Sequence, residues 1–554
     1  MKNKIKKTSI RIFVGISILF TIAFTTDNYF EISKNLDIFA TLYREINLFY
    51  VDETEPGKLM KTGIDAMLKS LDPYTVFIPE SKIEDYKFMT TGQYGGIGAI
   101  IQKRDEYVMV AEPYEGWPAQ KAGLIAGDII IKINGKSTKG LNTEQVREML
   151  VGQPGTDVEL TVKRQDKEIQ VKLIREEIKI KDVPYYGMVN ETTGYIKLNG
   201  FTETAAQEVK DAFTTLKAKG MEKLIFDLRG NGGGLLNEAV KIVGFFVDKG
   251  TTVVSTKGKI KEWDKVYKTP NTPLDKDMPL VVLIDKYSAS ASEIVSGSLQ
   301  DLDRSVIVGE NSFGKGLVQQ VKDLSYNSKL KLTVAKYYTP SGRCIQKLDY
   351  SNKDEKGEAQ EVPDSLIHEF ETLKSHRKVI DGKGISPDVK VEKIKSTKLL
   401  ESLVANFVIF DFATAYYFQH DSIPSPEKFN ISDSEYNQFV DYVKNKKIDY
   451  KTATEKELEK LKKIAKEENF EEDVADELSK LEEELKKHKN DDIYEYKNDI
   501  KLFLENEIVG RYYYQTGQIR ASLVKDPVLK KAKEIIADDA QYSAILSGLT
   551  ENKK

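Results

Sequence analysis

Between residues 190 and 395 the sequence alternates short apolar runs with amphipathic segments. The apolar runs are GYIKLNGF (194–201), LIFDLR (224–229), PLVVLIDK (279–286) and SVIVGE (305–310). The segments from Thr204 to Lys219, after Gly234 and from Ser292 have the spacing of helices. Because a buried strand followed by a helix is the repeating unit of α/β proteins, this alternation predicts an α/β core.

Composition restricts the chemistry that this core can carry. The chain has 554 residues, too many for one domain, and its 83 Lys and Arg nearly balance its 87 Asp and Glu. That balance excludes a protein built around a basic nucleic-acid surface. A single cysteine, Cys344, excludes an intramolecular disulfide and a cysteine-based zinc site. The histidines are too scattered to predict a metal centre: His368, His376, His420 and His488. We therefore expect no metal or other cofactor.

The first residues predict an export signal. A basic stretch from Lys2 to Arg11 precedes an apolar run from Ile12 to Phe24, which is short for a membrane-spanning helix. We expect a signal peptide or an uncleaved membrane anchor over residues 1–26, and a location in the periplasm or cell envelope, with attachment to the inner membrane if the segment is retained. The alternative is a buried helix of the folded protein.

Changes in composition along the chain divide the rest into four parts. We expect a helical region over residues 27–91, a Gly-rich β-domain over 92–178, the α/β core over 179–396 and a helical extension over 397–554. Of the 40 residues from 451 to 490, 23 are charged, and their apolar residues keep helical spacing. This pattern favours a solvated helical hairpin over a specific partner site.

The β-domain opens with a glycine-rich loop, Gly95, Gly96, Ile97 and Gly98. The motifs A-G-L (122–124), G-D-I (127–129) and N-G (134–135) follow in order, and the whole segment resembles a PDZ domain. Successive backbone N–H groups can hold one carboxylate while a neighbouring strand edge pairs with an extended peptide. The resemblance therefore implies that these four residues receive a substrate C-terminus; on their own they would equally fit a tight turn.

Three segments of the core could carry chemistry. The loop GNGGG (230–234) follows a buried strand and can aim N–H groups at an oxyanion, although phosphate-binding loops look similar. Ser288, Ser290 and Ser292 occupy a strand-to-helix turn, where serines also serve as helix caps. Lys315 stands between two glycines after an apolar strand. Most lysines are solvated, but a desolvated lysine can act as a general base.

Together these segments resemble the C-terminal processing (tail-specific) peptidases, a PDZ-containing serine protease family with a Ser–Lys dyad, over about residues 60–395. The motifs that carry the resemblance are S-A-S-A-S-E (288–293) and F-G-K-G-L-V-Q (313–319). The resemblance implies Ser290 as nucleophile, Lys315 as general base and Gln319 as its assistant. It also implies oxyanion donors at Ala291 and at a glycine of GNGGG, of which we favour Gly233. The family often has proline where this chain has Gly232.

The fold implied is a multidomain α/β protein, a crotonase-like protease core with an inserted PDZ domain and helical segments at both ends. The function implied is an exported serine endopeptidase that binds protein C-terminal tails and cleaves them through an acyl-enzyme, with protein or peptide partners and no nucleic acid. Two alternatives remain: a non-catalytic PDZ adaptor on a protease-like scaffold, and a crotonase-like acyl-CoA enzyme.

Overall fold

The computed structural model describes residues 29–392, 397–446, 450–469 and 471–549. The expected export segment, residues 1–26, lies outside the described residues. The chain divides into two compact units, one comprising Met1–Glu80 with Gln319–Thr333, the other Ser81–Val318 with Val334–Lys554. Each unit is described by itself.

The first unit is built on helices, as its sequence predicted. Residues 29–49 are helical, α2 (Pro56–Lys69) follows, and β1 (Val76–Ile78) pairs with the first residues of β18 (Lys329–Tyr338). The chain turns after α2 because the Asp72 carboxylate accepts the N–H groups of Tyr74 and Thr75, each at 2.8 Å. Gln319 belongs to this unit and lies on β17 (Leu317–Asp323).

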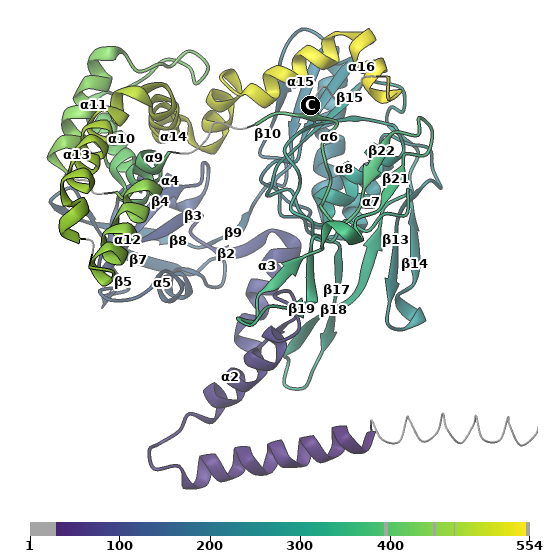
Figure 1. Ribbon diagram of the computed structural model, residues 1–554, viewed down its shortest axis with the longest axis horizontal. Coiled ribbons are helices and arrows are strands. Elements are labelled where there is room, and N and C mark those ends of the chain that lie inside the picture. The colour runs from purple at the N-terminus through teal and green to yellow at the C-terminus, as the bar shows by residue number, and fades with distance from the viewer. Residues whose placement is uncertain (1–28, 393–396, 447–449, 470, 550–554) are drawn as a thin grey trace, which may run out of the picture. The chain divides into compact units, whose positions relative to one another are not determined.

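A six-stranded sheet forms the core of the second unit (Figure 1). Its order is β10-β11-β12-β15-β16-β23, and all neighbours are parallel except β10 and β11. The strands are β10 (Tyr185–Met188), β11 (Thr193–Lys197), β12 (Lys223–Asp227), β15 (Leu280–Ile284), β16 (Val306–Gly309) and β23 (Val389–Lys390). The connecting helices are α6 (Ala205–Ala218), α7 (Leu236–Val243) and α8 (Ala291–Asp301). The expected α/β core is thereby confirmed.

Both faces of this sheet are covered. Successive strand residues point to opposite faces, so Phe226 and Val282 pack against α6, α7 and α8, whereas Ile225 and Val281 point the other way. That second face is closed by α15 (Pro527–Ala537) and α16 (Asp539–Leu546), which lie along it in Figure 1. Two helices from the very end of the chain therefore complete the hydrophobic core of the α/β fold.

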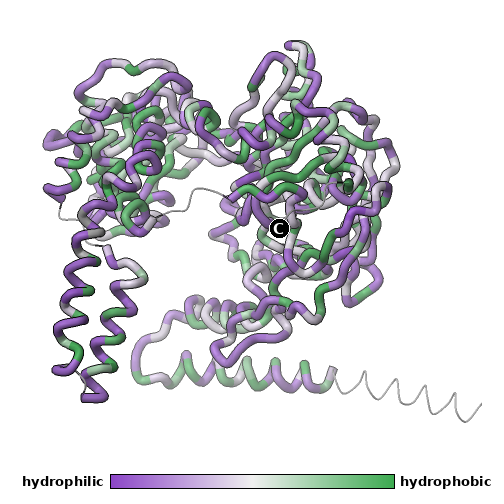
Figure 2. The backbone as a smooth tube through the Cα atoms, turned by 45° about the horizontal axis from the view of Figure 1, so that its top comes forward, coloured by the Kyte–Doolittle hydropathy of each residue, from purple (hydrophilic) through white to green (hydrophobic). Residues whose placement is uncertain are grey.

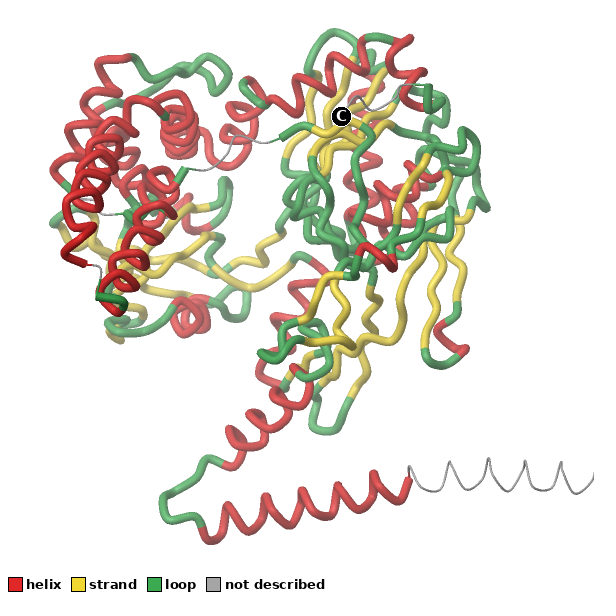
Figure 3. Tube along the Cα trace, viewed as in Figure 1, coloured by secondary structure: helices red, strands yellow, loops and turns green. Residues whose placement is uncertain are grey.

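The Gly-rich domain is a β-sheet domain with a buried core of its own (Figure 3). The sheet order is β3-β4-β5-β7-β8, with β6 paired to β5, and a separate ladder joins β2 to β9. The strands are β2 (Gln93–Gly96), β3 (Ala99–Arg104), β4 (Tyr107–Pro113), β5 (Ile129–Ile133), β6 (Lys136–Ser137), β7 (Asp157–Arg164), β8 (Lys167–Ile174) and β9 (Glu176–Lys179). Its helices are α4 (Pro118–Lys121) and α5 (Thr143–Leu150), with α3 (Ile83–Thr91) before it.

The extension after residue 397 is helical, as predicted. Before α15 and α16 it comprises α9 (Lys398–Ala405), α10 (Val408–Gln419), α11 (Asp433–Asn445), α12 (Ala453–Glu467), α13 (Glu471–Glu495) and α14 (Lys497–Val524). Leu403, Phe412 and Tyr436 are among the buried residues of its core. The tube in Figure 2 is mostly hydrophilic along α12 and α13, which form the expected hairpin. No described helix alone is long and apolar enough to cross a membrane; α9 and α10, bent by 59°, pass that test only as a pair.

The remaining strands lie outside the six-stranded core sheet. They are β13 (Thr252–Gly258), β14 (Lys265–Lys268), β19 (Leu348–Lys353), β20 (Ala359–Glu361), β21 (Glu369–Glu371) and β22 (Lys378–Ile380). Within the second unit, β13 pairs with β14 and with the last residues of β18.

Candidate active site

Ser290 occupies a strained turn between β15 and α8. Its backbone has φ 55° and ψ −111°, a conformation that costs energy for a residue other than glycine. Ser290 is half-buried, whereas Ser288 and Ser292 have no exposed surface. Their hydroxyls are committed to the main chain: Ser288 Oγ donates to the carbonyl of Leu228 and Ser292 Oγ to that of Asn231, each at 2.9 Å. Of the three serines, Ser290 has the conformation and exposure of a nucleophile.

The glycine-rich loop lies against this turn. The Asn231 carbonyl accepts the N–H of Ala289 at 3.0 Å as well as the Ser292 hydroxyl. Gly233 has φ 98°, and a Cβ atom there would lie 2.9 Å from Ser290 Cβ, so only glycine fits. The Gly233 N–H donates to Asn231 Oδ1 at 2.9 Å. To stabilise an oxyanion, this N–H must either leave Asn231 Oδ1 or donate to both oxygens at once. Ala291 is the first residue of α8, where N–H groups have no partner within the helix. The donor roles of Gly233 and Ala291 stay predictions.

Lys315 lies on a loop shaped by its flanking glycines. Gly314 has φ 86°, and a Cβ atom there would collide with Lys347 Cβ. The Gly316 N–H donates to Gln346 Oε1 at 2.7 Å. The lysine is half-buried and is held where the chain passes close to other main-chain segments. Close packing against Gln346 and Lys347 thus explains the two glycines, and the role of the lysine between them stays a prediction.

Glu293, which the sequence analysis did not single out, joins the serine turn to the lysine loop. Its side chain is fully buried. Its Oε2 accepts the N–H groups of Ser290 at 2.8 Å and Lys315 at 2.9 Å. Its Oε1 accepts the Ser312 hydroxyl at 2.5 Å and the Gly314 N–H at 2.7 Å. One carboxylate therefore holds the main chains of both expected catalytic residues.

The environment of Glu293 makes it sensitive to substitution. Burial raises the pKa of its carboxyl, while the four donors oppose that rise. The sequence signal for it was weak: a glutamate three residues after a serine at a helix start is typical of a capping box and predicts only a cap. The link to residues 312–315 depends on tertiary structure.

Replacing Glu293 by glutamine is expected to lower both turnover and stability. An amide cannot accept at its NH₂ end, so two of the four donors lose their acceptor, at a cost of about 1–3 kcal/mol each. We expect a loss in kcat of about 10-fold or more because both catalytic loops shift. Asp388→Asn is the matched control: this carboxylate, 11% exposed, accepts the Ile307 N–H at 2.7 Å and pairs with Arg377. The control should lose stability in urea yet retain kcat; equal kcat losses in both variants would contradict the assignment.

The remaining expected site residues are Gln319 and the loop at 95–98. Gln319, in the first unit, donates from Nε2 to Thr333 Oγ1 at 3.2 Å, and its assistance to Lys315 stays a prediction. Gly95 and Gly96 lie in β2 and pair with β9. Ile97 is buried in the β-domain, and Gly98 directly precedes β3, the terminal strand of its sheet. A loop beside a terminal strand suits peptide pairing, and the role of these four residues in binding a C-terminus stays a prediction.

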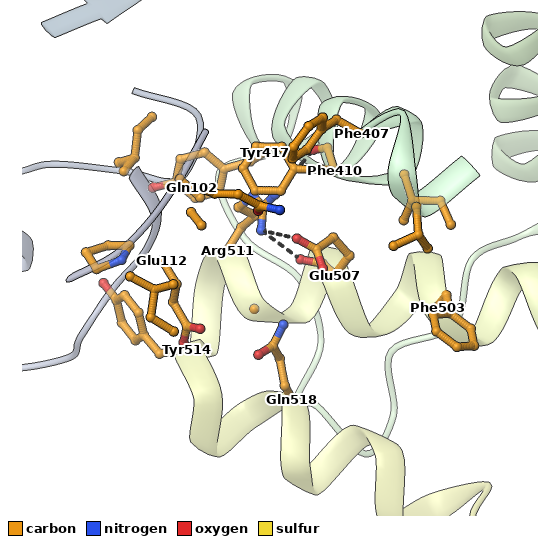
Figure 4. A pocket seen from close by; sticks show the side chains of 18 of the residues that line it. Gln102, Glu112, Phe407, Phe410, Tyr417, Phe503, Glu507, Arg511, Tyr514 and Gln518 are labelled. Carbon is orange, nitrogen blue, oxygen red and sulfur yellow. Dashed lines mark hydrogen bonds and ion pairs between the residues drawn. The ribbon is translucent and has the colours of Figure 1, made fainter. Parts of the chain in front are cut away.

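A pocket of about 330 Å³ lies between the β-domain and the helical extension (Figure 4), and none of the predicted catalytic residues lines it. Arg511 and Glu507 point toward one another inside it and pair at 2.8 Å. Nearby, Arg104 of β3 forms two hydrogen bonds with Asp411 of α10, at 2.5 and 2.7 Å. Each of these four charged side chains thus has an oppositely charged partner within the protein. The residues that line the pocket belong to the β-domain and to the helical extension.

Three family models match separate parts of the chain. Residues 192–351 match the family described as peptidase family S41, residues 109–164 match the PDZ domain, and residues 399–536 match the C-terminal helical domain of probable PDZ-proteases. A probable CtpA-like serine protease of Staphylococcus aureus is 39% identical over 316 residues, which are 56% of this chain and 63% of that protein. The chain thus spans less than two thirds of that relative.

A second relative is covered more fully. The carboxy-terminal-processing protease of Bartonella bacilliformis is 37% identical over 328 residues, which are 58% of this chain and 75% of that protein. The solved structure of a photosystem II D1 C-terminal processing protease is 28% identical, with 64% of this chain and 92% of that one covered and a TM-score of 0.35. Because of its identity to the Bartonella bacilliformis relative and its match to the family model, the chain belongs to the carboxy-terminal-processing proteases of peptidase family S41.

Proposed function

We propose that this protein is a serine endopeptidase that binds polypeptides by their C-terminal tails and cleaves them through an acyl-enzyme on Ser290. The observation that carries the proposal is the attachment of Ser290 and Lys315 to one buried carboxylate, Glu293. The strain and exposure of Ser290, against two fully buried neighbouring serines, support its role as nucleophile.

The reaction proceeds in two halves. Lys315 Nζ, as the neutral amine, takes the proton of Ser290 Oγ while the oxygen attacks the peptide carbonyl. The N–H groups of Ala291 and Gly233 hold the tetrahedral oxyanion. When the C–N bond breaks, the protonated Lys315 gives its proton to the leaving amine. Water then attacks the acyl-enzyme while Lys315 accepts a proton from it. As the bond from the acyl carbon to Ser290 Oγ breaks, Lys315 returns that proton to Oγ, which restores the serine hydroxyl and the neutral amine.

The β-domain supplies the selection of substrates. The loop Gly95–Gly98 takes the terminal carboxylate, and the peptide extends along β3. The export signal expected in residues 1–26 would place this activity in the cell envelope. An adaptor without catalysis would bind the same tails and leave them intact.

A pair of substrates that differ only at the C-terminus tests the selection. We expect a peptide with a free carboxylate to be cleaved with a kcat/KM about 10- to 100-fold higher than its C-terminally amidated twin, because hydrogen bonds to a charged group contribute roughly 1.5–3 kcal/mol. The measurement is kcat/KM for both, with a short free-acid peptide as competitor. Equal cleavage of the two substrates would contradict recognition of the C-terminus.

A further inference from the structure

The start of the glycine-rich loop is held by a buried arginine between two carboxylates. Arg229 directly precedes Gly230, and its side chain is 12% exposed. Its Nη2 lies 2.6 Å from Asp227 Oδ2 and 2.6 Å from Asp526 Oδ2. Asp227 belongs to the α/β core, whereas Asp526 lies in the C-terminal extension, directly before α15. A residue far along the chain therefore reaches the base of the expected oxyanion loop.

The core side of this cluster is rigid. Asp227 is buried and accepts the Tyr195 hydroxyl at 2.6 Å. Burial opposes its ionisation, but Arg229 and Lys197 outweigh burial and lower the pKa of the Asp227 carboxyl. Asp227 Oδ1 also accepts the Arg229 N–H at 2.9 Å, and Lys197 Nζ donates to the Arg229 carbonyl. Main chain and side chain of Arg229 are thus both fixed.

The extension side is equally well fixed. Asp526 caps α15 by accepting the N–H groups of Val528 at 2.8 Å and Leu529 at 3.1 Å. Both residues are buried against the second face of the core sheet. Because α15 is anchored by its apolar face, the Asp526 carboxylate cannot follow Arg229 if the loop moves, and it resists such movement.

We propose that Asp526 is a positioning residue for the oxyanion loop, acting through Arg229; this proposal rests on the proposed function. The Gly230 N–H donates to Asp285 Oδ1 at 2.9 Å, and Gly233, three residues further on, lies so close to Ser290 that a Cβ atom would not fit between them. The clamp on Arg229 therefore sets where the loop begins relative to the nucleophile. Oxyanion donors act mainly in the transition state, so their displacement lowers kcat and leaves substrate binding in place.

Asp526→Asn tests this role with little change in shape. Asparagine caps a helix as well as aspartate does, but it removes the charge that faces Arg229. We expect kcat to fall about 10- to 100-fold, less than the loss of a whole oxyanion donor, with KM nearly unchanged. The affinity of a peptide aldehyde, whose adduct with serine carries the oxyanion, should fall by a similar factor. Asp526→Glu, which keeps the charge, should retain more kcat than Asp526→Asn.

Asp539→Asn is the matched control. Asp539 begins α16, is 81% exposed and pairs with Lys223 at 2.7 Å, so it joins the same extension to the same sheet without contacting Arg229. We expect this variant to have wild-type kcat and aldehyde affinity. Rates are divided by the fraction of active enzyme, titrated with a stoichiometric serine-directed probe, so that partial unfolding does not count as a slower reaction.

Three outcomes would overturn the proposal: a wild-type kcat in Asp526→Asn, equal losses in Asp526→Asn and Asp539→Asn, or a loss fully accounted for by fewer active sites. If the wild-type protein itself hydrolyses no peptide, the proposed function fails, and the positioning role fails with it. That result is distinguishable because it precedes any comparison of variants.

Discussion

Replacing Ser290 by alanine is expected to lower kcat by at least about 10⁴-fold while leaving peptide affinity unchanged. Without its Oγ the turn has no nucleophile, and the N–H groups that would hold an oxyanion have no covalent adduct to stabilise. The β-domain and its loop at 95–98 are untouched, so binding should survive. The measurements are single-turnover hydrolysis and the Kd of a labelled free-acid peptide for both proteins.

Ser288→Ala and Ser292→Ala are the matched controls for this result. Each removes a buried hydroxyl bonded to the main chain, of Leu228 and Asn231 respectively. Each should lower the free energy of unfolding by about 1–3 kcal/mol and keep most turnover. If Ser290→Ala retained turnover and Ser288→Ala lost it, the nucleophile would be assigned to the wrong serine.

Replacing Lys315 by arginine is expected to lower kcat by about 10²- to 10⁴-fold, the usual contribution of a general base. Arginine keeps the positive charge but does not lose its proton in a protein. A free lysine titrates near 10.4, and a base that works near neutrality needs a lower pKa. Because the neutral amine is the active form, wild-type activity should rise with pH through one ionisation at about pH 7–9. The pH–rate profile of both proteins measures this.

Histidine variants separate a Ser–Lys dyad from a histidine-based triad. His368 and His376 are exposed and lie beside Asp381 and Glu371, and His420 stacks on Tyr416. Single alanine replacements of these three and of His488 should leave the rate nearly unchanged. A loss in any one of them comparable to that of Lys315→Arg would contradict the dyad and restore the triad.

The sequence predicted the α/β core because its signal is local. Apolar strands and amphipathic helices recur in order, and residues such as Ile225 and Phe226, adjacent in sequence, cover opposite faces of the sheet. The sequence predicted the helices of the extension equally well. Its packing partner was not predictable, because the apolar face of α15 indicates burial but does not indicate that the helix packs on β12, β15 and β16, more than 200 residues earlier.

The site was predictable in its residue types and less so in its connections. Residue patterns alone left Ser288, Ser290 and Ser292 as alternatives, and only the family resemblance chose among them. The strain at Ser290 and the burial of its neighbours supply a physical reason for that choice. Glu293 resembled an ordinary cap in sequence, because its second set of partners lies about 20 residues away. Gly233 lies close to Ser290, its role as oxyanion donor stays a prediction, and nothing in the sequence pattern indicates the hydrogen bond from its N–H to Asn231.

The central claim is that Ser290 is a nucleophile activated by Lys315. Its most direct test is to treat the protein with a serine-directed fluorophosphonate and locate the adduct by peptide mass spectrometry. We expect one adduct on Ser290 in the wild-type protein, and almost none in Lys315→Arg at the same pH, because the proton acceptor is lost. An adduct on a different serine, full labelling of Lys315→Arg, or no adduct on the wild-type protein would contradict the claim.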